Sequence, residues 1–296
     1  MERAETAVVA VAAAFGRDVD AGLDSIERTV VEAQARGARL VVFPECTLGG
    51  YLREPMPGEH GPELPVALDP DGPEIARLVR IAGDIVVCVG YTEAGADRPF
   101  SSAVCVSGDG VLGRHRKVHL PPGERFAYAA GDRFEAFDTP VGRMGMLICY
   151  DKLFPEAARA LALDGAQTIA SLAAWPVCRQ RPAREIAHDR QTRHFNAIDA
   201  ARAVENQVVW VSANQTGTLG PLRFLGNAKV VDPDGLVLAG TGSRAGLAVA
   251  QVDAEDAVRD SRFGIDHLAD RRPSAYGGAR RTAATTTTAA GAVEQL

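Results

Sequence analysis

Several features that would mark other classes of protein are missing from this chain. Only three of its 32 basic residues are lysines and its net charge is −6, so it lacks the dense basic surface of a nucleic-acid-binding protein. No apolar run reaches the roughly 18 residues needed to span a membrane. Residues 1–5 are charged and lack the apolar core of a signal peptide. We therefore expect a cytoplasmic protein that acts on neither nucleic acids nor membranes.

The pattern of cysteines argues against two further kinds of site. Five cysteines stand at positions 46, 88, 105, 149 and 178, and no pair has the Cys-x-x-Cys spacing. An odd number without that spacing disfavours both a disulfide framework and a structural zinc site. We expect free thiols and no bound metal, as is usual in the reducing cytoplasm.

Two common catalytic signatures are missing as well. No Gly-x-Ser-x-Gly motif occurs, and none of the six histidines stands beside an obvious nucleophile. The glycines of Gly240–Gly246 have the wrong spacing for a dinucleotide fingerprint, and they follow no strand–helix–strand unit. Serine-hydrolase chemistry and dinucleotide chemistry are therefore both disfavoured.

What the chain does contain is an alternation of apolar strands and amphipathic helices. The strands are predicted at 6–13, 39–45, 84–93, 100–106, 111–118, 143–148, 167–173, 208–213, 228–231, 236–238 and 247–252, and the helices at 18–37, 72–82, 155–163 and 183–205. This mixture predicts an α/β fold with helices covering a mixed sheet. We expect one domain over residues 5–255 and a C-terminal extension, 256–296, whose end is mobile.

Cys149 is the first candidate for chemistry. It follows the apolar run 146–148 and precedes Pro155, an order that predicts a strand, a tight turn and a helix start. A thiol in that turn would stand at the rim of a sheet, where a substrate can reach it. A lone cysteine after an apolar strand is more often an inert core residue, so this segment alone does not decide its role.

Two charged residues also stand at predicted strand ends. Glu45 closes the apolar run Leu-Val-Val-Phe-Pro-Glu, where its carboxylate is either solvated or partly buried with a raised pKa suited to a general base. Lys117 differs in parity from the two neighbouring arginines, so an alternating strand would turn it inward, where an ammonium needs a carboxylate partner. For the other two lysines, Lys152 and Lys229, we attribute their presence in a lysine-poor chain to chance and expect no chemical role.

Together these segments resemble the nitrilase, or carbon–nitrogen hydrolase, superfamily. The resemblance rests on blocks that occur in the family's order: Phe43-Pro44-Glu45, Arg116–Leu120, Ile148–Asp151 with Phe154-Pro155-Glu156, Ala201–Gln207, the strand through Asn214, and Leu225-Gly226 leading to Asp232–Gly235. It implies a four-layer α-β-β-α sandwich with mixed sheets. It also implies pairing through the helices, as a homodimer or a higher homo-oligomer.

The resemblance further implies a Glu-Lys-Cys triad. Glu45 would be the general base, Lys117 the oxyanion stabiliser and proton donor, and Cys149 the nucleophile. Glu124 matches a second family glutamate that helps to hold the site. A backbone N–H near Tyr150 would complete the oxyanion site, and the reaction would need no metal or organic cofactor.

The pair Tyr150-Asp151 is similar to the amidase branches, because many nitrilases carry Trp-Glu after the cysteine. The implied enzyme is a thiol hydrolase that cleaves a small linear amide or an N-carbamoyl compound through a thioester, releasing ammonia or an amine. Three alternatives stay open: a nitrilase using the same triad, an acyl or glutamine-amide transfer enzyme, and a non-catalytic ligand-binding protein on the same scaffold.

Contacts with the substrate are less well defined. Tyr150 and Trp175 are expected to border the substrate pocket, although plain core packing would explain Trp175 equally well. Five arginines between residues 179 and 193 could meet a carboxylated substrate. Because charged runs on helices are usually solvated, we expect them to form a solvated face instead.

Overall fold

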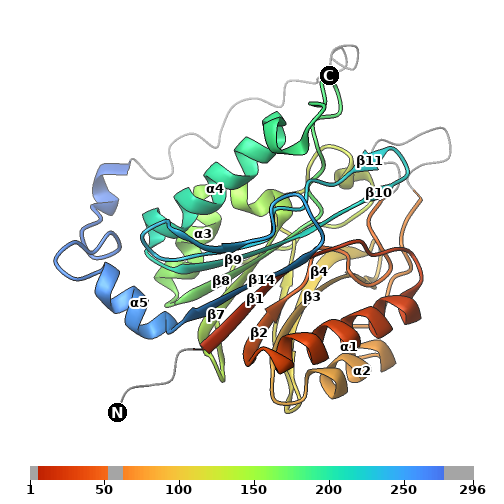
Figure 1. The fold of residues 1–296 in the computed structure, drawn as a ribbon, viewed down its shortest axis with the longest axis horizontal. Coiled ribbons are helices and arrows are strands. Elements are labelled where there is room, and N and C mark those ends of the chain that lie inside the picture. Colours follow the sequence, from red (N-terminus) through yellow and green to blue (C-terminus); the bar gives the residue numbers. More distant parts are fainter. Residues whose placement is uncertain (1–5, 53–62, 277–296) are drawn as a thin grey trace.

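The fold is a stack of two β-layers between two helical layers. The computed structural model describes residues 6–52 and 63–276 (Figure 1). One half of the strand path contains β1 (Thr6–Ala13), β2 (Ala38–Val42), β3 (Val86–Glu93), β4 (Phe100–Ser107), β5 (Gly110–Arg116) and β14 (Gly246–Val252). The other half contains β6 (Phe137–Thr139), β7 (Gly142–Ile148), β8 (Thr168–Ala173), β9 (Val209–Gln215), β12 (Lys229–Val231) and β13 (Val237–Gly240).

Helices cover the outer faces of the two halves. They are α1 (Val19–Ala35), α2 (Pro73–Ala82), α3 (Pro155–Leu163) and α4 (Arg190–Asn206). The fifth helix, α5 (Ala254–Ser261), follows β14 and packs Ala254 and Ala257 against the core between the two halves. A small separate hairpin consists of β10 (Thr218–Leu219) and β11 (Leu222–Arg223). Figure 1 shows α1 and α2 on one side of the strands and α3 and α4 on the other. None of the helices in the described part of the chain is long and apolar enough to cross a membrane.

Hydrogen bonding links the strands in the order β5-β4-β3-β2-β1-β9-β8-β7-β6. At the middle of this path β1 and β9 share only two residue pairs, Ala12 with Asn214 and Ala13 with Gln215. The path can therefore fold there, so that the two halves face each other. Pairing is parallel from β1 to β3 and from β7 to β9, and antiparallel elsewhere along the path within each half. The predicted mixed α/β fold with four layers is confirmed.

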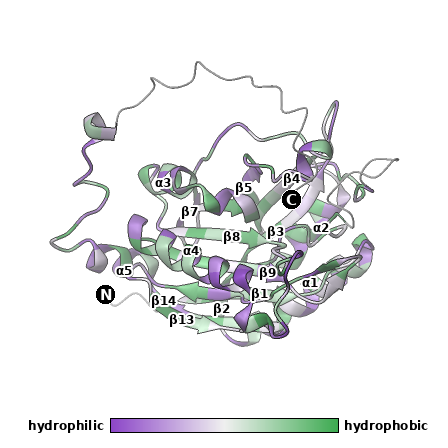
Figure 2. Cartoon of the chain, turned by 90° about the horizontal axis from the view of Figure 1, so that it is seen from above, coloured by the Kyte–Doolittle hydropathy of each residue, from purple (hydrophilic) through white to green (hydrophobic). Residues whose placement is uncertain are grey.

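The alternation of side chains along each strand explains why the layers stack. On β1, Val8 and Ala10 face the core between the two halves, whereas Val9 and Val11 pack against α1 and α2. The same rule places Leu147 of β7 against α3. Figure 2 shows hydrophobic residues concentrated on the strands and hydrophilic residues mainly on the surrounding helices and loops. Strands buried on both faces are expected to be apolar throughout, and this is the pattern observed.

The long helix α4 begins later than the sequence predicts. The expected helix over 183–205 starts at Arg190, because Asp189 caps it and accepts the N–H of Gln191 at 2.8 Å. The other carboxylate oxygen of Asp189 accepts the N–H of Ala183 at 2.9 Å. The preceding residues therefore fold back as a loop around one carboxylate instead of forming two more helical turns.

Two other expectations need correction. The strand predicted over 39–45 ends at Val42. The last predicted strand, 247–252, is followed by α5 and the 3-10 turn Pro273–Tyr276, and neither of these was predicted. The short strands β6, β10 and β11 were not predicted. The C-terminal end expected to be mobile, beyond about residue 275, lies outside the described residues except for residue 276. The division into a domain and an extension stays a prediction.

Candidate active site

The candidate residues come from strand ends that meet at one edge of the stacked layers. Glu45 lies three residues beyond β2, Lys117 directly follows β5, and Cys149 directly follows β7. Because the carboxyl ends of parallel strands share one edge, the topology brings the acid of one half to the thiol of the other. This edge therefore holds the three residues that the sequence singled out.

Lys117 is the centre of a buried charged cluster. Its Nζ donates to Glu45 Oε1 and to Glu124 Oε1, both at 2.7 Å. All three side chains are buried, and Tyr51 OH donates to Glu124 Oε1 at 2.5 Å. Burial alone would lower the pKa of Lys117, but the charges of Glu124 and Glu45 raise it well above its usual value. The group is therefore a fixed ammonium, as an inward-pointing lysine with carboxylate partners should be.

Groups at the ends of β8 and β9, in the other half, hold Glu45 in place. Its Oε2 accepts the N–H of Ala174 at 2.9 Å, and its own carbonyl accepts from Gln215 Nε2 at 3.1 Å. Ser101 Oγ lies 3.5 Å from Oε1. A carboxylate fixed at both oxygens is well placed to move a proton at one position without swinging away.

Cys149 begins a 3-10 turn, Cys149–Leu153, with a positive φ of 48°. Only 8% of the residue is exposed. Burial raises the pKa of its thiol well above the usual value, and the charge of Glu45 adds to this effect. Lys117 and the N–H of Ala174 act in the opposite direction but do not cancel it. Cys149 therefore rests as a thiol, and any attack by its sulfur would need a base to remove the proton.

Glu124 has an unusual titration for a carboxyl group. Burial, together with the charge of Glu45, raises its pKa to about 7 against the opposing effect of Lys117. Its Oε2 is buried and has no hydrogen-bond partner among the described residues. The folded chain thus keeps this proton at pH values where the unfolded chain has lost it. The contribution of Glu124 to stability therefore falls as the pH rises from about 4.5 to about 7.

A second carboxylate fixes the turn that carries the thiol. Asp151 accepts the N–H groups of His119 at 2.8 Å and Ile148 at 3.2 Å, and both its oxygens contact a histidine ring, that of His115 or His119, at 3.0 Å. Burial would raise the pKa of Asp151, but the contacts with the two histidines lower it below its usual range. The sequence marked Asp151 only as part of a motif, and its anchoring role was missed.

Tyr150 and Trp175 each follow a residue of the site directly in the sequence. Tyr150 follows the thiol, is half-buried and packs edge-on against Phe154 at 5.3 Å. Trp175 follows the residue whose N–H binds Glu45, and its Nε1 donates to Gln191 Oε1 at 2.9 Å. It is buried in the core between the two halves. Its position fits core packing, and contact of either residue with a substrate stays a prediction.

The attribution of Lys152 and Lys229 to chance is wrong. Both side chains are buried, and both pair with Asp199 of α4. The scarcity of lysine in the chain was the signal that could have revealed them. By contrast, the five arginines between residues 179 and 193 are all exposed, as expected for a solvated face.

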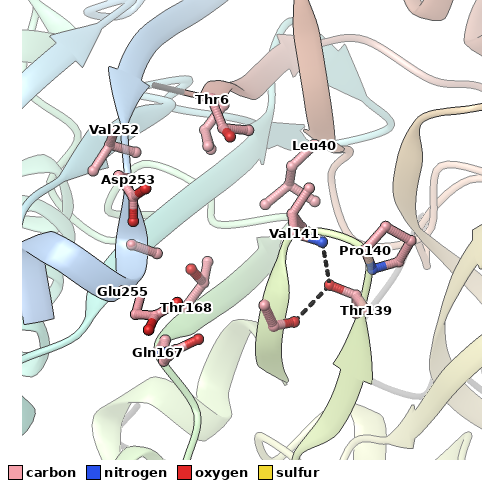
Figure 3. A pocket seen from close by; sticks show the side chains of 13 residues that line it. Thr6, Leu40, Thr139, Pro140, Val141, Gln167, Thr168, Val252, Asp253 and Glu255 are labelled. Carbon is pink, nitrogen blue, oxygen red and sulfur yellow. Dashed lines mark hydrogen bonds between the residues drawn. The ribbon is translucent and has the colours of Figure 1, made fainter. Parts of the chain in front are cut away.

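The cavity in Figure 3 lies at the other end of the strands. It has a volume of about 510 Å³, and its lining includes Thr6, Gly142 and Thr168, which begin β1, β7 and β8. Cys149 follows the opposite end of β7, so this cavity is separate from the charged cluster. No group of three or more His, Cys, Asp or Glu side chains suited to a metal ion occurs within residues 6–52 and 63–276.

Known proteins are similar to this chain over most of its length. A family model for carbon–nitrogen hydrolases matches residues 6–261. The chain is 32% identical over 263 residues to a nitrilase of Pyrococcus abyssi, covering 87% of this chain and 93% of that protein. It is 29% identical over 286 residues to N-carbamoylputrescine amidase of Solanum tuberosum, covering 91% and 93%.

A solved structure is similar over nearly the whole chain. It is that of a mutant of the amidase from Nesterenkonia sp. AN1, showing the result of Michael addition of acrylamide at the active-site cysteine. Its TM-score is 0.73, its sequence identity is 26%, and the match covers 91% of this chain and 98% of that one.

Proposed function

Because the chain belongs to the carbon–nitrogen hydrolase family, we propose that it hydrolyses a small linear amide or N-carbamoyl compound through a thioester on Cys149. The observation that carries this proposal is the pair of 2.7 Å bonds that fix the Lys117 ammonium between two buried carboxylates beside a thiol. The sequence-based assignment to this family of hydrolases is confirmed. The residue roles and the substrate class are the proposal.

In the first half of the reaction, Glu45 accepts the thiol proton as the sulfur of Cys149 attacks the amide carbon. The carbonyl electron pair moves to oxygen, and the oxyanion is stabilised by the Lys117 ammonium and the N–H of Tyr150. The intermediate collapses as the C–N bond breaks, and Glu45 returns its proton to the leaving nitrogen. This step releases ammonia or an amine and leaves a thioester.

In the second half, water attacks the thioester carbon while Glu45 accepts a proton from it. Collapse of this second intermediate breaks the C–S bond, and the sulfur of Cys149 recovers the proton from Glu45. The carboxylic acid leaves, or carbamic acid in the case of an N-carbamoyl compound. Glu124 supports both halves by holding Lys117.

A panel of matched amides, ureas and nitriles tests this function by release of ammonia. Butyramide and butyronitrile form one matched amide and nitrile pair. An N-carbamoyl amine represents the second proposed substrate class, the N-carbamoyl compounds. We expect turnover of an amide or N-carbamoyl compound and little or none of the matched nitrile. Faster turnover of the nitrile would favour the nitrilase alternative. No turnover, together with no labelling of Cys149 by an alkylating reagent, would favour a non-catalytic binding protein.

The contact between Gly90 and the Glu45 segment offers a test of the general base. A Cβ added to Gly90 would lie 2.6 Å from the backbone nitrogen of Cys46 and 2.8 Å from Glu45 Cα, so this backbone must move. We expect Gly90→Ala to lower kcat by about 10²-fold, because small displacements of catalytic groups are costly. Stability should fall by about 1–3 kcal/mol.

Gly240→Ala is the matched control, because a Cβ there would meet no atom closer than 3.7 Å. Kinetics on an active amide and urea unfolding of both variants provide the measurements. Unchanged turnover in Gly90→Ala would contradict the role given to Glu45. A homodimer or higher homo-oligomer and a cytoplasmic location remain predictions from the sequence.

A further inference from the structure

A second buried charged cluster lies behind the nucleophile turn. Asp199 of α4 accepts from Lys152 Nζ at 2.7 Å, from Lys229 Nζ at 2.6 Å and from Trp210 Nε1 at 3.0 Å. Lys152 and Asp199 are fully buried, and Lys229 is 5% exposed. Lys152 belongs to the same 3-10 turn as Cys149, so the cluster is joined directly to the thiol segment.

Aromatic rings enclose the two ammonium groups. Lys152 Nζ lies 3.2 Å and Lys229 Nζ 4.2 Å from the centre of the Phe195 ring. The Trp175 ring lies 5.1 Å from Lys152 Nζ. The rings exclude water while their faces attract cations. The charges in this cluster therefore act through a medium of low dielectric constant, where their effect on neighbouring groups is large.

The cluster holds one more positive charge than its single carboxylate can neutralise. One carboxylate faces two ammonium groups, and among the described residues Asp199 is the only ion-pair partner of either lysine. Elsewhere on α4, Arg202 and Glu205 pair with each other at 2.9 Å. Burial lowers the pKa of Lys152 to about 8 against the pull of Asp199. A single lysine would satisfy Asp199 with less desolvation, so packing alone does not explain the second one.

The charges around Cys149 suggest why a second ammonium group is present in this cluster. Lys117 is shared by Glu45 and Glu124, so that cluster is neutral when Glu124 is protonated and negative when it is ionised. Attack by the thiol transfers its proton to Glu45, so the net charge stays the same while one negative charge moves to the sulfur and then to the oxyanion. An ionised Glu124 would oppose that charge at its new position. A cation fixed behind the turn offsets this opposition. Cys149 and Lys152 lie three residues apart in one buried 3-10 turn, so the cation and the sulfur share the same surroundings.

We propose that Lys152 is a positioning residue for Cys149. The Lys152 ammonium, held by Asp199, supplies a positive potential that favours the thiolate of Cys149 and the oxyanion. Arg202 supports this by donating to the carbonyls of Lys152 at 2.8 Å and Leu153 at 3.1 Å, which ties the turn to α4. The proposal rests on the proposed function in one respect, that Cys149 is the nucleophile.

The experiment compares Lys152→Met with Lys229→Met. Each variant removes one ammonium from the same carboxylate and the same ring, so their structural costs are matched. The rate of alkylation of Cys149 by iodoacetamide is followed against pH, with the labelled residue identified by mass spectrometry. At pH 7, where Lys152 of the wild type is still charged, we expect alkylation to be about tenfold slower in Lys152→Met, and the difference should shrink above pH 8 as that lysine loses its proton. Lys229→Met should slow alkylation at pH 7 by less than half as much.

Steady-state kinetics add a second readout. Lys152→Met should lower kcat by about tenfold with little change in KM, since the charge acts on the reacting state and not on substrate binding. A wild-type alkylation rate at pH 7 in Lys152→Met, or equal slowing in the two variants, would overturn the proposal. If Lys152→Met does not fold, Lys152→Gln serves instead, because its amide can still donate to Asp199. No labelling of Cys149 in the wild type would instead refute the proposed function, and this inference with it.

Discussion

Cys149→Ala is expected to lose at least about 10⁴-fold in turnover of every amide, urea and nitrile that the wild type accepts. Without the sulfur no thioester forms, and the fixed Lys117 ammonium has no covalent intermediate to stabilise. Cys149→Ser should also be nearly inactive, because Glu45 removes the proton of an alcohol far less readily than that of a thiol. Ammonia release and mass spectrometry for an acyl adduct provide the measurements.

Cys105→Ala is the matched control for this substitution. Cys105 is a fully buried cysteine that faces the core between the two halves, away from the charged cluster. Its loss is expected to lower stability and leave kcat unchanged. Both Cys149 variants should keep the circular dichroism spectrum of the wild type, because the residue begins a turn and fills little of the core. More than about one hundredth of wild-type turnover in Cys149→Ala would contradict the assigned nucleophile.

Local patterns predicted much of the fold because they depend on neighbours along the chain. The apolar face of α1, with Leu23, Ile26 and Val30, follows from the helical period and is buried as predicted. The inward direction of Lys117 followed from its parity with the neighbouring arginines, and the structure gives it the carboxylate partners it needs. These features require no knowledge of the rest of the molecule.

What the sequence could not predict depends on groups far apart in the chain. Tyr51 bonds to Glu124 across 73 positions, and the N–H of Ala174 fixes Glu45 across 129 positions. Neither contact leaves a periodic signal. The late start of α4 has a more local cause, because Asp189 binds the N–H groups of Cys178 and Ala183 in the preceding loop, and such side-chain-to-backbone contacts leave no periodic signal. Short elements such as β6 contain too few residues to show a period.

The pairing of Asp199 with two buried lysines is the long-range contact with the largest expected effect on stability. We expect Asp199→Asn to lower the free energy of unfolding by about 3–5 kcal/mol, because it leaves two buried ammonium groups without a carboxylate. The amide oxygen can still accept from Trp210, so the loss reports mainly the missing charge. Urea unfolding of wild type and variant provides the measurement.

The pH dependence of this loss distinguishes charge from packing. In Asp199→Asn the folded chain holds lysine protons less tightly than the unfolded chain, so its stability rises with pH until the lysines of the unfolded chain are also neutral. The deficit relative to the wild type should therefore be smaller at pH 9.5 than at pH 7. Glu32→Ala, which breaks the exposed pair with Arg36, is the control and should change stability by no more than about 0.5 kcal/mol. A deficit that is independent of pH would show that shape, and not charge, is what Asp199 contributes.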